Sequence, residues 1–144
     1  MSIFVNKKDA GISEDQGPTE NSMENQIRIS SEAVKRAETD EDKLVSLLFL
    51  AGDYRQNEQY DQAIAQYQQV LNRDSSNIQA LGGMVLCYQA KRDAENTIKY
   101  AQQALASIES SDDKDTESIE YYQQVIQKTQ NGVFPMMQNE ESSP

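Results

Sequence analysis

The four residues Gln68-Gln69-Val70-Leu71 return 34 positions later as Gln102-Gln103-Ala104-Leu105, and this spacing decides the fold. The repetition extends over the whole stretch from Leu44 to Leu105. A fixed period of this length is typical of supersecondary units that stack side by side, because one such unit cannot bury its apolar face alone. The paired positions are Leu47 with Leu81, Leu50 with Met84, Tyr54 with Tyr88, Ile64 with Ile98, Val70 with Ala104 and Leu71 with Leu105.

Within each copy the apolar residues recur at helical spacing, which predicts two helices per copy. Short polar turns separate the helices of a copy, so consecutive helices should be antiparallel neighbours. The helix that holds Leu47-Leu48-Phe49-Leu50-Ala51 is apolar around most of its circumference, and we expect it to be sandwiched between neighbours. The expected helices cover residues 41–56, 60–73, 77–90 and 94–109.

The two copies resemble the tetratricopeptide repeat (TPR) family, whose pattern combines large, small and aromatic residues at fixed positions. In the second copy Val85 and Thr97 replace small residues, and Ala94 and Ala101 replace aromatic ones. The resemblance implies an all-α array of antiparallel helix-turn-helix units. Its residues are Leu47, Leu50, Ala51, Tyr54, Tyr60, Ala63, Tyr67 and Val70 in the first copy, and Leu81, Met84, Val85, Tyr88, Ala94, Thr97, Ala101 and Ala104 in the second.

Two further helices are expected to flank the repeats, within a helical domain of residues 24–130. Residues 24–38 carry apolar positions on one face without the repeat pattern and predict an extra helix. Residues 115–130 predict a capping helix, which by chain order is the first helix of a truncated third unit. Residues 1–23 are polar and predict a disordered lead, and residues 131–144 predict a flexible tail with an apolar cluster, Val133-Phe134-Pro135-Met136-Met137.

Composition restricts the function. The chain has 24 acidic and 13 basic residues, a net charge of −11, which argues against binding nucleic acid or an anionic membrane surface. It has no histidine, and its single cysteine, Cys87, has no candidate base partner, so we expect no enzyme activity, metal or cofactor. It has no apolar run long enough to cross a membrane, and its short apolar opening leads us to expect no secretory segment. We therefore expect a soluble, cytoplasmic protein that acts on other proteins.

The resemblance implies that the first helix of each unit lines a concave groove. Some TPR proteins grip a C-terminal carboxylate there with Lys and Asn, but those slots hold Leu48, Gly52, Gly82 and Leu86 in this chain. The groove is instead apolar, with a polar edge of Arg55, Gln56 and Gln89. This suits an apolar peptide or an amphipathic helix. The groove residues expected are Val45, Leu48, Gly52, Arg55, Gln56, Gln79, Gly82, Leu86 and Gln89.

Two questions stay open at this point, namely what occupies the groove and what the paired glycines do. As an alternative to a segment of another protein, the groove holds the protein's own helix 24–38 through Ile27 and Val34. The chain is then an assembly unit that self-associates into a homo-oligomer.

The second question concerns Gly82-Gly83, which lies within a predicted helix at a cost of roughly 1 kcal/mol per glycine. The pair allows either close packing against a neighbouring helix or a bare backbone that a ligand approaches.

Overall fold

A computed structural model describes residues 22–134 of the chain, and all regular structure in this range is helical. The all-α prediction is therefore confirmed. A first helix covers residues 22–36, two residues earlier at each end than expected. The expectations for residues 1–21 and 135–144 lie outside the described range. The other helices are α2 (Asp40–Gln56), α3 (Tyr60–Arg73), α4 (Ile78–Ala90), α5 (Ala94–Glu109) and α6 (Thr116–Gln130).

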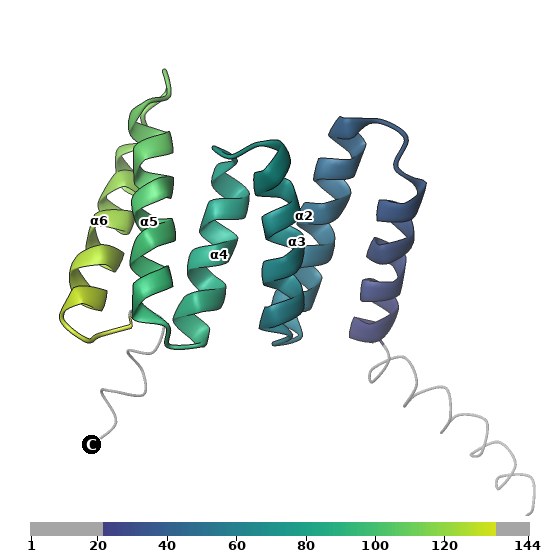
Figure 1. Cartoon of the computed structure of the whole chain (residues 1–144), viewed down its shortest axis with the longest axis horizontal. Coiled ribbons are helices and arrows are strands. Elements are labelled where there is room, and N and C mark those ends of the chain that lie inside the picture. The colour runs from purple at the N-terminus through teal and green to yellow at the C-terminus, as the bar shows by residue number, and fades with distance from the viewer. Residues whose placement is uncertain (1–21, 135–144) are drawn as a thin grey trace, which may run out of the picture.

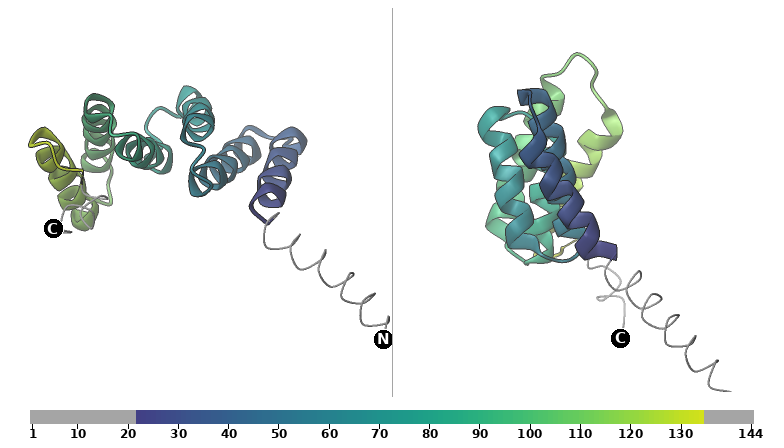
Figure 2. Two further views of the ribbon diagram at one scale, coloured as in Figure 1. Left: turned by 90° about the horizontal axis from the view of Figure 1, so that it is seen from below. Right: turned by 90° about the vertical axis from the view of Figure 1, so that its right-hand side faces the viewer.

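The helices stand in a row in chain order (Figure 1), with the helix of residues 22–36 at one end and α6 at the other. Each of α2 to α5 packs against the next helix in sequence, and α2 also contacts α4. The view from below in Figure 2 shows that successive helices alternate between the two sides of the row. The described chain is thus an extended array in which each helix packs mainly against its neighbours in chain order.

Polar side chains fix where the helices begin. The side chains of Thr39, Asn77, Asp93 and Asp115 each accept a hydrogen bond from a backbone N–H in the first turn of the following helix. Such caps satisfy amide groups that have no partner inside the helix. The acidic residues that follow Thr39 suit the positive end of α2.

The turns that follow α2 and α4 have the same geometry, 34 residues apart. Glu58 and Arg92 adopt left-handed backbone conformations, with φ angles of 61° and 59°. The N–H of Gln59 donates to the carbonyl oxygen of Tyr54 (2.8 Å), and that of Asp93 donates to the equivalent oxygen of Tyr88 (2.9 Å). A left-handed conformation is rare for residues other than glycine, so its recurrence at matched positions shows that the two units repeat in structure as well as in sequence.

The turn after α6 closes in the same way. Gly132 has a φ of 84°, and the N–H of Val133 donates to the carbonyl oxygen of Lys128 (2.8 Å). This third turn lies 40 residues after the second, because α5, the connection before α6 and α6 itself are each longer than α3, the connection before α4 and α4. α6 therefore ends as α2 and α4 do.

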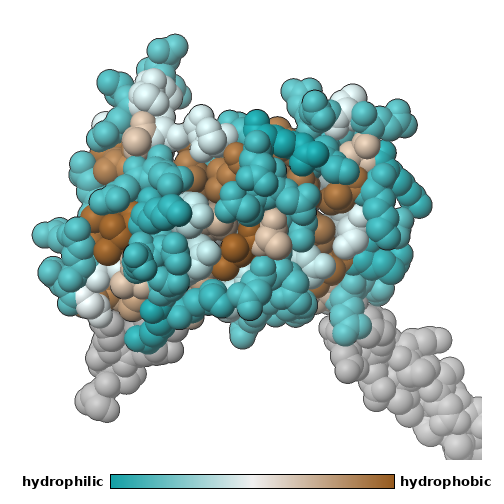
Figure 3. Space-filling model, in the orientation of Figure 1, coloured by the Kyte–Doolittle hydropathy of each residue, from teal (hydrophilic) through white to brown (hydrophobic). Residues whose placement is uncertain are grey.

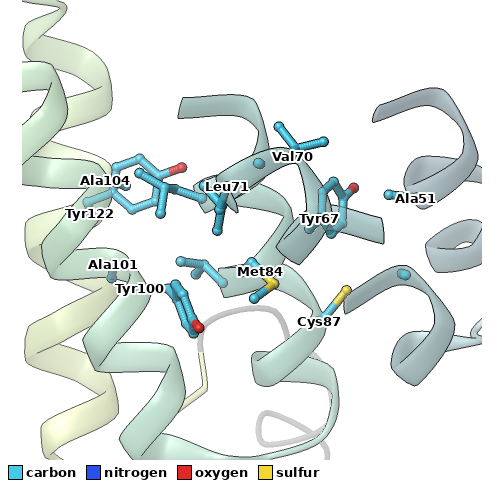
Figure 4. Packing of buried hydrophobic residues seen from close by; sticks show 14 of the residues in the cluster. Ala51, Tyr67, Val70, Leu71, Met84, Cys87, Tyr100, Ala101, Ala104 and Tyr122 are labelled. Atoms are coloured by element: carbon cyan, nitrogen blue, oxygen red, sulfur yellow. The ribbon is translucent and has the colours of Figure 1, made fainter. Parts of the chain in front are cut away.

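The core lies between consecutive helices, and α4 is its most deeply buried element (Figure 4). The closest approach is at Gly83, where an added Cβ atom would lie 2.1 Å from Cζ of the Tyr67 ring. Tyr67 of α3 is buried, so its ring lies directly against the backbone of α4. Gly83 thus serves close packing, which is one of the two roles expected for the glycine pair.

We predict that Gly83→Ala destabilises the fold. The new methyl group would collide with the buried Tyr67 ring, and overpacking of this kind costs about 1–3 kcal/mol. Gly52→Ala in α2 is the matched control, because its added Cβ would meet no atom within 4 Å apart from its chain neighbours and the backbone of α2 itself. The control should gain about 0.5–1 kcal/mol from helix propensity. Urea unfolding followed by circular dichroism measures both changes.

The contrast between the two variants is the readout. If Gly83→Ala is as stable as Gly52→Ala, the Tyr67 ring does not rest on the backbone of α4.

Candidate functional site

A groove of about 660 Å³ lies between α2, α4 and α6. Its wall is mostly apolar and aromatic. Arg55 is the one charged residue in the lining, and Gln79 is the one amide side chain. The lining residues are Val45, Leu48, Phe49, Gly52, Arg55, Tyr67, Ile78, Gln79, Gly82, Gly83, Leu86, Tyr121 and Tyr122.

The structure brings together most of the groove residues expected from the sequence. Gln56 and Gln89 are the exceptions. Gln56 is exposed at the end of α2 and is not part of the lining. Gln89 is buried, and neither polar atom of its side chain has a hydrogen-bond partner. The expected residues that line the groove are Val45, Leu48, Gly52, Arg55, Gln79, Gly82 and Leu86.

The sequence analysis missed the aromatic part of the lining. Tyr121 and Tyr122 of α6 were assigned to a capping helix without a place in the groove. The matched turns supply the signal that locates them: aligning Gly132 with Arg92 places Tyr122 at the position of Gly82. Phe49 was expected to be buried, and Ile78 stands just inside the start of α4.

Exposed apolar side chains gather in this groove. Among the described residues five large apolar side chains are exposed, and four line the groove: Val45 (50% exposed), Phe49 (66%), Ile78 (39%) and Tyr121 (43%). The fifth, Ile29 (53%), lies on the first helix. A contiguous exposed apolar surface is typical of an interaction site.

This distribution corrects the expectation that α2 is sandwiched between neighbours. One side of α2 packs in the core through Leu47, Leu50 and Ala51, while Val45 and Phe49 face the groove. The helix is apolar all round because it has two apolar faces with different roles. By contrast, hydrophilic side chains cover most of the face shown in Figure 3, with separate apolar areas between them.

Two tyrosines build the floor of the groove on the bare backbone of α4. An added Cβ atom at Gly82 would lie 2.7 Å from the Tyr122 hydroxyl oxygen, as the one at Gly83 would meet the Tyr67 ring. Burial raises the pKa of Tyr122 to about 12 and also raises the pKa of Tyr67, so both phenols stay neutral at physiological pH. The floor is therefore an uncharged aromatic surface.

Arg55 stands at the edge of this floor. Its Nε–H donates a hydrogen bond to the Tyr67 hydroxyl oxygen at 3.4 Å. Within residues 22–134 no carboxylate forms an ion pair with Arg55. The positive charge thus faces the groove without a counter-charge from the described part of the chain.

The helix of residues 22–36 lies at the α2 end of the array and contributes no residue to the groove (Figure 2). The Ser30 hydroxyl donates a hydrogen bond to the Asp53 carboxylate of α2, and Val34 packs against the core. A shallow depression on this helix, formed around Ile29 and Ala33, is separate from the groove.

Groups that support catalysis or metal binding are sparse. Cys87 is fully buried, and burial raises the pKa of its thiol to about 11, which disfavours the reactive thiolate. No cluster of Cys, Asp and Glu among the described residues is arranged to hold a metal ion. In the same range, no helix combines the length and apolar character needed to cross a membrane.

Comparisons with protein-family models, curated proteins and solved structures give no significant match to this chain.

We predict that Cys87 resists alkylation in the folded protein. At pH 8.5 its thiolate fraction is far below that of an unfolded cysteine, because the folded pKa is about 11 against an ordinary value of 9.0. Iodoacetamide labelling followed by mass spectrometry should therefore be at least tenfold slower in buffer than in urea. Equal rates would mean that the thiol is accessible and that α4 is not buried on this side.

Proposed function

We propose that this chain is a TPR-like adaptor without enzyme activity, whose groove binds an apolar peptide or an amphipathic helix of another protein. The observation that carries the proposal is the position of Val45, Phe49, Ile78 and Tyr121. These four exposed apolar side chains line one groove. Leaving them in water is unfavourable, and a partner that covers them gains roughly 25 cal/mol per Å² of apolar surface buried.

The repeated geometry supports the TPR assignment. α2 and α4 end 34 residues apart, at Gln56 and Ala90, and α3 and α5 begin 34 residues apart, at Tyr60 and Ala94. The intervening turns share the same hydrogen bonds and the same left-handed residue. The matching turn after α6 supports its place as the first helix of a third unit.

The shape of the lining favours an extended or helical segment as the ligand. The groove is bounded by three helices and is open to solvent, with glycines at Gly52 and Gly82 where side chains would narrow it. An amphipathic helix presents its apolar side chains as a stripe that such a groove receives. Tyr121 and Tyr122 suit an interface, because each has an apolar ring and a polar end.

The alternative is an assembly unit whose groove holds its own first helix. The position of residues 22–36 supports the adaptor instead, since this helix packs beside α2 and lines none of the groove. Ile29 is exposed on this helix, outside the groove.

We predict that the double substitution Val45→Asp, Phe49→Asp weakens ligand binding without unfolding the protein. Both side chains are at least half exposed, so the fold tolerates the charges, while an apolar ligand does not. The ligand is a helix-forming peptide selected from a displayed random library, and fluorescence anisotropy measures its dissociation constant. We expect a loss of at least tenfold.

Ile29→Asp is the matched control, because Ile29 is similarly exposed but lies outside the groove. It should leave peptide affinity unchanged. The proposal fails if the selection yields no peptide whose binding depends on Val45 and Phe49, or if Ile29→Asp weakens binding as much as the double variant does.

A further inference from the structure

We infer that Arg55 makes the groove selective for a segment that places an Asp or Glu side chain among its apolar residues. The inference rests on the proposed function and specifies the chemistry of the partner. Its starting point is charge: the lining of the groove is apolar, aromatic or amide apart from this one guanidinium group.

The guanidinium group is contacted from below by a long hydrogen bond of 3.4 Å. Its Nε–H is bound to the Tyr67 hydroxyl, and the Tyr67 ring is fixed against the backbone at Gly83. An arginine side chain has five N–H donors, so four remain after this bond. No described residue accepts a hydrogen bond from those four. Arg55 is therefore placed beside Tyr67, with most of its hydrogen-bonding capacity unused by the described residues.

A carboxylate is the group that best uses this capacity. The planar fork of terminal N–H groups matches the two oxygens of a carboxylate, and such charge-assisted pairs are stronger than neutral hydrogen bonds. The apolar walls strengthen the pair further, because they lower the local dielectric constant once a ligand excludes water. A lysine of the ligand placed beside Arg55 would be repelled by the guanidinium charge and would also lose its hydration.

Space for the carboxylate is present beside Arg55. Gly52 lies three residues earlier on the same face of α2, and no heavy atom lies within 4 Å of the position of a Cβ atom there. A ligand side chain can thus approach the guanidinium group over Gly52. The groove then has an apolar part around Phe49 and Ile78 and a cationic edge at Arg55.

The net charge of the protein makes this selectivity diagnostic. With a charge of −11, the chain attracts basic peptides and repels acidic ones at long range. If an acidic residue is nevertheless selected at one ligand position, the selection opposes the long-range electrostatic repulsion by the protein and therefore indicates a local contact.

The test is a set of parallel selections from a displayed random library of helix-forming peptides. The wild type should enrich Asp or Glu at one position among the apolar ones. Arg55→Glu should enrich Lys or Arg at that position. Arg55→Gln, which keeps the length of a polar side chain, should retain the apolar positions and lose the charge preference. Circular dichroism confirms that each variant is folded.

A double-mutant cycle then measures the contact. Replacing the selected acid by its amide should weaken binding to the wild type by about tenfold or more, the loss expected for one charge-assisted hydrogen bond, and should not weaken binding to Arg55→Gln. Synthetic peptides with an amidated C-terminus ensure that the side chain, and not the chain end, is read.

The outcomes separate the two proposals. Groove-dependent apolar peptides without an acidic position, or an acidic position that Arg55→Gln selects equally, overturn the inference and leave the groove as a binding site. A preference for the C-terminal carboxylate alone also overturns it. A selection without any groove-dependent peptide overturns both.

Discussion

The structure depends on a contact between an aromatic ring and a bare stretch of helix backbone. The ring of Tyr67 rests on α4 at Gly83, at a distance that leaves no room for a methyl group. Each glycine in a helix costs roughly 1 kcal/mol relative to alanine, and Gly82-Gly83 places two in succession. The burial of the tyrosine ring offsets this cost, and it sets how closely the first unit approaches the second.

The same contact links the fold to the groove. Tyr67 contributes its ring to the core and its hydroxyl group to the position of Arg55, so one side chain connects the packing of α3 on α4 with the charge at the groove edge. Tyr122 completes the floor from α6 through the neighbouring Gly82. The two glycines therefore have different roles. Gly83 allows the Tyr67 ring to pack against the backbone of α4, and Gly82 allows Tyr122 to form part of the groove floor.

The sequence predicts the helices and the turns, because apolar residues recur at helical spacing within a 34-residue period. Most of the groove lining is implied by the resemblance to the TPR family and not by the period itself. The sequence does not predict the exposure of Phe49, because periodicity cannot distinguish an apolar face in the core from an apolar face that binds. It misses Tyr121 and Tyr122, because extra residues in α5, in the connection before α6 and in α6 shift the third unit out of the period. It misplaces Gln89, because a polar residue gives no indication of the neighbours that cover it.

The most direct test of the account is an NMR titration of the ¹⁵N-labelled chain with a selected amphipathic peptide. The central claim is that the surface between α2, α4 and α6 binds the ligand. It predicts that the largest shifts in the amide resonances occur at Phe49, Gly52, Gly82 and Tyr121, with little change in residues 22–36. Largest shifts in α3 and α5, or in the first helix, would contradict it.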